Sequence, residues 1–182
     1  MKNSTSTRRD FLVGISALGL TGLMPASLLA QRKMLLRRIP GTNEMLPIIG
    51  LGSSKPVSQI GDDGMGPISE VLRTLVAQGG RVVDTWPRNP ANDEAFGQVI
   101  NQPDLRDALF VTSKIDQVGK QAGIDQFRET QRLYQRETLD LLQVFSLTDV
   151  ETQWANLKDF KAAGEVRYIG VTVSTARLYE DL

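Results

Sequence analysis

The 182-residue chain contains no cysteine and no histidine. Without cysteine it can form no disulfide and carry out no thiol chemistry. Without histidine as well, a metal ion would have only carboxylate and carbonyl oxygens as ligands. One polar cluster, Asn89, Asn92 and Asp93, offers a single carboxylate and two amides, which is a poor ligand set for a hard cation. We therefore predict no metal site.

A surplus of charge is also missing, because 21 Lys and Arg residues balance 21 Asp and Glu residues. A chain without net charge has no overall electrostatic attraction to nucleic acid or to an anionic membrane, so we expect neither as a partner. The composition is 41% hydrophobic and 23% charged, which is typical of a soluble globular domain. It gives no indication of a disordered or fibrous chain.

The first thirty residues have the layout of an export signal. Arg8 and Arg9 precede a mildly apolar, glycine-containing stretch at 13–23, and Asp-Phe-Leu follows the arginine pair, which resembles a twin-arginine signal. An anchored N-terminal helix is the alternative, but the apolar run is shorter than the ~20 residues of a membrane span. We predict that residues 1–30 are the signal and that residues 31–182 form the mature domain. It would be periplasmic or otherwise exported, with no stable membrane span after cleavage.

After the signal, apolar runs alternate with helical patterns. A small hairpin is expected at 34–47, and strands are expected at 48–52, 81–84, 109–114, 139–145 and 166–172. Helices are expected at 67–78, 92–100, 123–134 and 150–163, with another beginning at 175, and the stretch leading to Gly66 is expected to be a loop. Strands that alternate with helices predict right-handed βαβ units and a parallel sheet.

Two architectures with a parallel sheet are possible, a closed eight-stranded barrel and an open doubly wound sheet. A closed eight-stranded barrel typically needs about 250 residues, and the mature chain has roughly 150. An open doubly wound sheet fits this length. Its G-x-G-x-x-G signature is absent, however, because the first strand continues as Gly50-Leu51-Gly52-Ser53-Ser54.

Five strand segments, taken in order, resemble the aldo/keto reductase family. They lie at 47–52, 83–85, 109–114, 139–144 and 164–172. Each motif alone is weak, but five ordered matches are specific. The resemblance implies an α/β fold that is a partial (β/α)8 TIM barrel, five of eight strands with an N-terminal hairpin. It also implies NADPH-dependent reduction of a small aldehyde or ketone.

The resemblance assigns catalytic positions residue by residue. In this family a tyrosine donates the proton, a lysine paired with an aspartate lowers the pKa of that tyrosine, and a histidine orients the carbonyl. The aspartate matches Asp84 and the lysine matches Lys114, whereas the tyrosine position holds Asn89 and the histidine position holds Phe145. An amide cannot serve as this proton donor, and a phenyl ring donates no hydrogen bond. We therefore expect carbonyl reduction to be weak or lost.

The resemblance also implies that NADPH contacts Gly52, Ser53, Ser54, Asp84 and Thr172. In the family the loops after strands seven and eight bind the phosphates, and these loops lie outside the five predicted units, so NADPH affinity is expected to be reduced.

From the residues alone, other roles stay open. Asp84 fits a turn before proline, and Lys114 fits a solvated strand end. Trp86 fits either a substrate-facing aromatic residue or packing beneath its loop. The cluster at 132–136 is expected to be a solvated helix end.

A function of another class also remains open. The chain would then be a non-catalytic binding or assembly protein, or a decayed gene fragment. An open five-stranded sheet exposes two edges, which favours self-association or completion by a separate chain.

Overall fold

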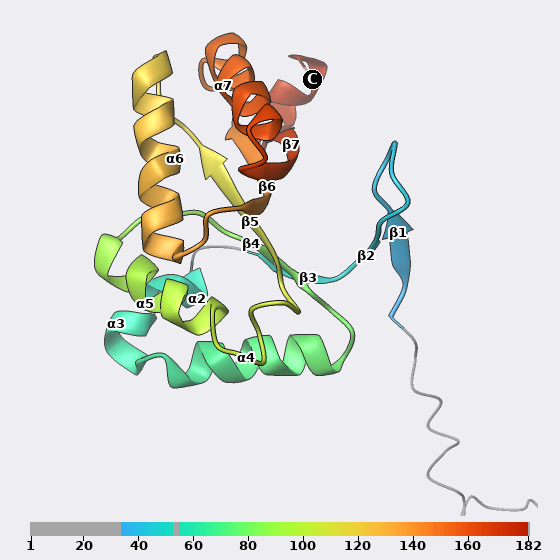
Figure 1. Cartoon of the computed structure of the whole chain (residues 1–182), viewed down its shortest axis with the longest axis vertical. Coiled ribbons are helices and arrows are strands. Elements are labelled where there is room, and N and C mark those ends of the chain that lie inside the picture. The colour runs from blue at the N-terminus through green and yellow to red at the C-terminus, as the bar shows by residue number, and fades with distance from the viewer. Residues whose placement is uncertain (1–33, 53–54, 182) are drawn as a thin grey trace, which may run out of the picture. The chain divides into compact units, whose positions relative to one another are not determined.

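The computed structural model describes residues 34–52 and 55–181. The predicted signal at 1–30, together with Ser53 and Ser54, lies outside the described residues. Two sheets occur in the described part, an antiparallel pair and a five-stranded parallel sheet (Figure 1).

The parallel sheet has the strand order β3-β4-β5-β6-β7, so each strand pairs with its neighbours in the sequence. Its strands are β3 (Gly50–Gly52), β4 (Val82–Asp84), β5 (Phe110–Ile115), β6 (Leu139–Phe145) and β7 (Val166–Thr172). The antiparallel pair is β1 (Leu36–Arg38) with β2 (Met45–Pro47). The helices are α2 (Lys55–Ser58), α3 (Ile60–Asp63), α4 (Gly66–Ala77), α5 (Pro90–Ile100), α6 (Lys120–Tyr134) and α7 (Val150–Ala162), followed by the 3₁₀ helix η2 (Ala176–Asp181).

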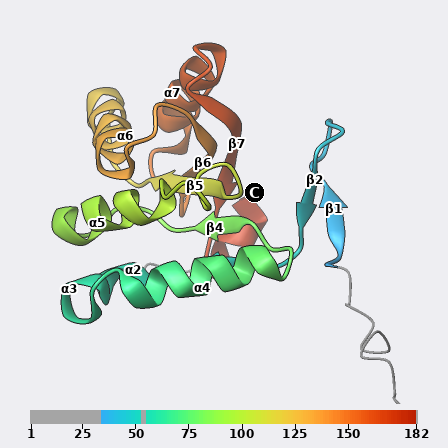
Figure 2. The ribbon, with the colours of Figure 1, turned by 60° about the horizontal axis from the view of Figure 1, so that its bottom comes forward.

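Each of the helices α4 to α7 connects one parallel strand to the next. Figures 1 and 2 show α4 and α5 running side by side, and α6 packs against both α5 and α7. A doubly wound sheet reverses its strand order and carries helices on both faces. This sheet keeps one order throughout, which is the arrangement of consecutive units in a (β/α)8 barrel.

The pleat of the strands separates an apolar face from a mixed face. On β6, Leu142 and Val144 are 0% exposed and belong to the main core. Their neighbours Leu141, Gln143 and Phe145 point to the opposite face and are partly exposed. The core also contains Val83, Val111 and Ile115 from the strands and Leu72, Phe96, Phe127 and Leu157 from the helices. The structure therefore concentrates apolar packing between the sheet and its helices.

Helices α5 and α6 approach each other closely at Gly97. A Cβ atom placed there would lie 2.0 Å from the carbonyl oxygen of Leu133 and 3.1 Å from the Cα of Tyr134. Both contacts are with backbone, which cannot move aside as a flexible side chain can. The glycine is therefore required by this packing.

Polar contacts attach the β1–β2 hairpin to β7. Glu44 accepts hydrogen bonds from Arg167 Nη2 and, at 2.7 Å, from the Tyr168 hydroxyl. Arg167 also donates to Asp140 at 2.5 Å. The hydrogen bond from Tyr168 and the charge of Arg167 lower the pKa of the Glu44 carboxyl. The two contacts of Glu44 connect residues more than a hundred positions apart in the sequence.

The predicted hairpin, the five strands and the partial-barrel fold are confirmed. Two expectations were wrong. The stretch before Gly66 is not all loop, because α2 and α3 each form about one helical turn there. The cluster at 132–136 is not fully solvated either, because Tyr134 is 0% exposed and packs edge-on against Phe96. Burial raises the pKa of the Tyr134 hydroxyl well above its ordinary value.

No helix within residues 34–52 and 55–181 combines the length and the apolar character needed to cross a membrane.

Candidate active site

Asp84 and Lys114 come from adjacent strands and share one face of the sheet. Asp84 ends β4 and lies in register with Thr112 of β5, and Lys114 follows two residues later. Because side chains alternate along a strand, all three point to the face opposite the main core. Register and alternation thus place the two sequence-predicted residues together at the carboxyl ends of their strands.

The carboxylate of Asp84 accepts two hydrogen bonds on one oxygen. Lys114 Nζ donates to Oδ1 at 2.6 Å, and Thr112 Oγ1 donates to the same atom at 2.7 Å. The Lys114 side chain is 4% exposed, whereas that of Asp84 is 45% exposed. A buried ammonium requires an opposite charge, and Asp84 supplies it from the side that solvent reaches.

The sequence interpretation did not include Thr112. Its position two residues before Lys114 places it on the same face as the lysine, and its side chain is 2% exposed. Lys114 stands out in the sequence as the polar end of a β-branched run, whereas the link from Thr112 to Asp84 depends on the register between β4 and β5. The candidate site therefore has three connected members instead of two.

The indole ring of Trp86 covers the ammonium of Lys114. The ring centroid of Trp86 lies 4.7 Å from Lys114 Nζ and 5.0 Å from the ring centroid of Phe145. The guanidinium of Arg88 lies 4.0 Å from the same indole and pairs weakly with Asp116 at 3.9 Å. The indole of Trp86 thus lies beside the candidate site and also packs against its own loop, so both roles that the sequence left open stay compatible with its position.

Asn89 has a different structural task. Its side-chain oxygen accepts hydrogen bonds from the backbone N–H groups of Ala91 and Asn92, at 3.1 and 3.5 Å, and so caps the N-terminus of α5. Asp93 accepts the backbone N–H groups of Arg88 and Asn89 at 2.6 and 2.7 Å. Asp93 is 2% exposed, and its burial raises the pKa of its carboxyl despite these two donors. The residue at the matched tyrosine position thus serves to begin a helix.

The polar cluster of Asn89, Asn92 and Asp93 is occupied by contacts of this kind. Asn92 donates its amide to the backbone carbonyl of Ser58 at 3.0 Å, and Asn89 and Asp93 bond to the start of α5. Within the described ranges, no group of three or more metal-ligating acidic side chains occurs.

Gly52 and Thr172, two of the residues predicted to contact the cofactor, lie at the ends of strands β3 and β7. Gly52 is in register with Asp84, and a Cβ atom at Gly52 would meet no other atom within 4 Å. Thr172 is in register with Phe145 and is partly exposed. Ser53 and Ser54, predicted as further contacts, lie outside the described residues. Open space therefore exists beside Asp84, at the edge strand β3.

The loops next to the site are connected by a network of polar contacts. Asp149 accepts the backbone N–H of Gly119 at 2.7 Å and the Thr152 hydroxyl at 2.8 Å. The bond from Gly119 has the larger effect, and together with the bond from Thr152 it lowers the pKa of the Asp149 carboxyl. Gln153, which is 0% exposed, donates to the backbone carbonyls of Gln117 and Gly119. The loop after β5 is thereby fixed to the start of α7.

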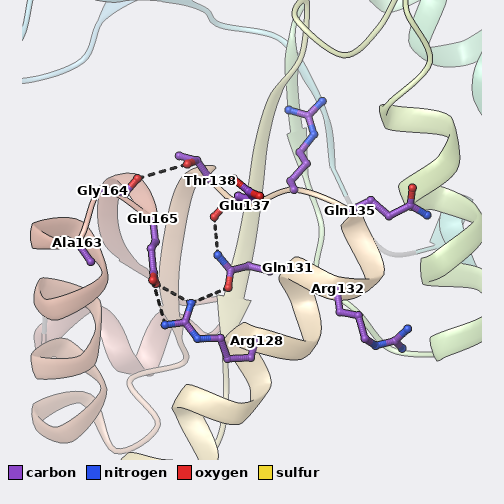
Figure 3. A pocket seen from close by; sticks show the side chains of 10 residues that line it. Arg128, Gln131, Arg132, Gln135, Glu137, Thr138, Ala163, Gly164 and Glu165 are labelled. Carbon is purple, nitrogen blue, oxygen red and sulfur yellow. Dashed lines mark hydrogen bonds and ion pairs between the residues drawn. The ribbon is translucent and has the colours of Figure 1, made fainter.

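A separate cavity of about 750 Å³ lies where α6 ends and β6 begins, at the opposite end of the strands from Lys114. Figure 3 shows Arg128 between Glu165 and Gln131, and the arginine bonds Glu165 twice, at 2.7 and 3.0 Å. Arg132 is paired in the same way with Glu129. This cavity lies away from the carboxyl ends of the strands, where (β/α)8 barrels have their active sites, so Asp84 and Lys114 mark the better candidate site.

Comparison with known proteins connects this geometry to a family. Residues 50–182 match the model of the aldo/keto reductase family. Among solved structures, the holo form of an aldo-keto reductase from Bacillus halodurans is 16% identical, with a TM-score of 0.65 over 81% of this chain. An aldo-keto reductase from Klebsiella pneumoniae in complex with NADPH is 23% identical, with a TM-score of 0.57 over 79% of this chain. A search of curated proteins found no significant match.

The chain spans 53% of the Bacillus halodurans protein and 52% of the Klebsiella pneumoniae protein. Identities this low show the fold alone, whereas the family match extends from β3 to the last residue of the chain. The chain belongs to the aldo/keto reductase family.

Proposed function

We propose that this chain carries an NADPH-dependent carbonyl-reducing site of aldo/keto reductase type, with its proton-donating half replaced, so that turnover is weak. The observation that carries the proposal is the 2.6 Å pair between Lys114 and Asp84 at the carboxyl ends of adjacent parallel strands. Active sites of (β/α)8 barrels lie at this end of the strands. Family membership supports the reaction class.

The side chains that are present suit the binding of a carbonyl oxygen. An ammonium has three N–H donors, and the bond to Asp84 Oδ1 uses one of them. Thr112 fixes the carboxylate of Asp84, and Asp84 holds the head group of Lys114, so a donor of Lys114 can polarise a carbonyl placed beside it. With Asn89 serving as a helix cap and Phe145 apolar, the general acid of the family reaction has no counterpart at these two positions. Such acids contribute about 10²–10⁴-fold in rate.

The described part of the site offers space for NADPH beside Gly52. The open space beside Gly52 lies next to Asp84, and NADPH would supply the hydride for the carbonyl carbon. Two aldo/keto reductase structures from Klebsiella pneumoniae contain NADPH or NADP. By this likeness we propose that NADPH contacts Gly52, Asp84 and Thr172, and the family resemblance of the sequence adds Ser53 and Ser54 to the proposed contacts.

Binding and turnover test the proposal separately. NADPH fluorescence should change saturably on titration with the purified mature chain. NADPH oxidation in the presence of a small aldehyde should be slow and should disappear in Lys114→Met. The matched control is Lys158→Met, an exposed lysine on α7 that should leave both signals unchanged. A chain that shows no NADPH binding would contradict the proposal.

A restored variant gives a sharper test. Phe145→His combined with Asn89→Tyr returns both replaced groups and should raise the rate of NADPH oxidation by about 10²–10⁴-fold. The Asn89 change also removes the cap of α5, which should cost about 1 kcal/mol of stability. Phe145→His alone, which keeps the cap, should give a smaller gain. No gain in a folded double variant would count against this assignment of positions.

A non-catalytic binding or assembly role is the second candidate. The observation that favours it is the open sheet, in which β3 and β7 are the outermost strands and the partly exposed Leu141 and Phe145 lie on the mixed face. Unpaired strand edges favour association with a second copy or a completing chain. Size-exclusion chromatography with circular dichroism tests the incomplete-fold version of this role, because a compact, cooperatively melting monomer would exclude it.

Export is proposed from the sequence alone. Arg8 and Arg9 ahead of the mild apolar stretch at 13–23 support a twin-arginine signal and a periplasmic mature protein. Residues 1–30 fused to a reporter should direct it to the periplasm. Replacing both arginines with lysine should retain the reporter in the cytoplasm, and export that persists in this variant would contradict a twin-arginine route.

A further inference from the structure

The indole of Trp86 lies at the candidate site, but the proposed reaction gives it no role. Its centroid lies 4.7 Å from Lys114 Nζ, and the lysine side chain is only 4% exposed. Trp86 neither belongs to the Lys114–Asp84 ion pair nor replaces a matched family position. An aromatic residue from the loop after β4 thus covers the polar head group at the centre of the candidate site.

The spacing decides what can approach Lys114. Non-bonded heavy atoms sit about 3.5–4.0 Å apart, so a flat molecule inserted between two groups needs them roughly 7 Å apart. The indole and the ammonium are 4.7 Å apart. No molecule can therefore lie between them while Trp86 keeps this position. The approach that remains is along the Asp84 side chain, which is 45% exposed.

Several contacts hold the indole in place. Arg88 lies 4.0 Å from the ring on its own loop, and the ring of Phe145 on β6 packs against it at 5.0 Å. Cations and tilted aromatic rings are both attracted to the indole π-system. Trp86 is thus supported from β5, from β6 and from the loop after β4, so it acts as a fixed wall of the site.

We propose that Trp86 sets the size of the carbonyl compound that reaches Lys114, so that the site admits small aliphatic aldehydes and ketones and excludes aromatic ones. This inference names the substrate class of the proposed carbonyl-reducing function and rests on it. The half-exposed Asp84 leaves one approach to the ammonium, whereas Trp86, supported by Phe145, covers the ammonium on another side, so a planar ring should meet the indole before a small aliphatic chain does.

Reductive alkylation measures this access without any turnover. An aldehyde condenses with the amine of a lysine and releases water, and cyanoborohydride then reduces the imine to a stable secondary amine. Mass spectrometry of the Lys114 peptide, relative to that of the exposed Lys158, compares acetaldehyde with benzaldehyde. In the wild type, the Lys114-to-Lys158 ratio should be at least about tenfold lower with benzaldehyde than with acetaldehyde.

Substitutions at the two tryptophans complete the test. Trp86→Ala should bring the benzaldehyde ratio to the acetaldehyde ratio, and Trp86→Phe should give an intermediate value. The matched control is Trp154→Phe on α7, which should leave both ratios at their wild-type values. Trp86→Phe also serves as the readout if the alanine variant does not fold.

Two results would overturn the inference. One is equal ratios for the two aldehydes in the wild type, and the other is an unchanged benzaldehyde ratio in a folded Trp86→Ala chain. The proposed function fails by a different signal, namely the absence of NADPH binding, which leaves the alkylation ratios unaffected. The two failures are therefore distinguishable.

Discussion

The two faces of the parallel sheet differ in what they contribute. The face toward the helices is closed, and Leu142 and Val144 on it are 0% exposed. The opposite face carries Asp84 and Lys114, and its residues on β6 are partly exposed. Stability is therefore expected to depend mainly on the first face and chemistry on the second, although their residues alternate along the same strands.

The largest effect should come from a matched pair of neighbours on β6. Leu142→Ala should lower the free energy of unfolding by about 2–5 kcal/mol, because it leaves a cavity in the core between sheet and helices. Leu141→Ala, on the partly exposed face, should cost about 1 kcal/mol. Urea denaturation of both variants measures the contrast, and equal losses would show that the two faces are not energetically distinct.

Breaking the Lys114–Asp84 pair should have the next largest effect. Asp84→Asn leaves the 4% exposed ammonium without its countercharge and should cost about 2 kcal/mol. This is less than the roughly 3–5 kcal/mol for fully buried pairs, because solvent reaches Asp84. Lys114→Met in the Asp84→Asn background should recover part of the loss. A double variant that is less stable than Asp84→Asn would contradict a buried charge as the cause.

The hairpin attachment should contribute less. Glu44→Gln removes the charge that pairs with Arg167 and weakens the bond from the Tyr168 hydroxyl, for an expected loss of about 1 kcal/mol. Because the pKa of Glu44 is lowered in the folded protein, this stabilisation should be present above its ordinary value of 4.5 and be lost as the pH falls. Hydrogen exchange of residues 36–47 measures it. Protection that is unchanged in the variant would show that other contacts hold the hairpin.

The smallest effect concerns Asp93, in the first turn of α5. Burial raises the pKa of its carboxyl above the ordinary value of 3.8, so the folded protein binds more protons than the unfolded chain as the pH rises past that value. The contribution of Asp93 to stability should therefore fall with rising pH. Asp93→Asn removes this dependence, so its stability relative to the wild type should improve between about pH 4 and about pH 7. A constant difference would contradict the raised pKa.

Most of the candidate site was predictable, and the exceptions have a physical reason. Asp84 and Lys114 follow from short strands whose final polar residues stand out against β-branched runs. The place of Asn89 at the N-cap of α5 was missed because a family alignment compares positions and does not show which hydrogen bonds a side chain makes. Thr112 was missed because its link to Asp84 requires the register between β4 and β5, which no local pattern contains.

The amino-acid sequence by itself determined the order of strands and helices, the parallel sheet and the family, because hydrophobic periodicity and ordered motifs are local properties of a chain. Only the tertiary structure decided which side chains meet: Thr112 with Asp84, Glu44 with Tyr168, and the indole of Trp86 over Lys114. These contacts depend on strand register and on helix packing, which join residues that are distant in the sequence. Asp84 and Lys114 can thus be predicted from the sequence, whereas the position of Trp86 over Lys114 depends on the fold.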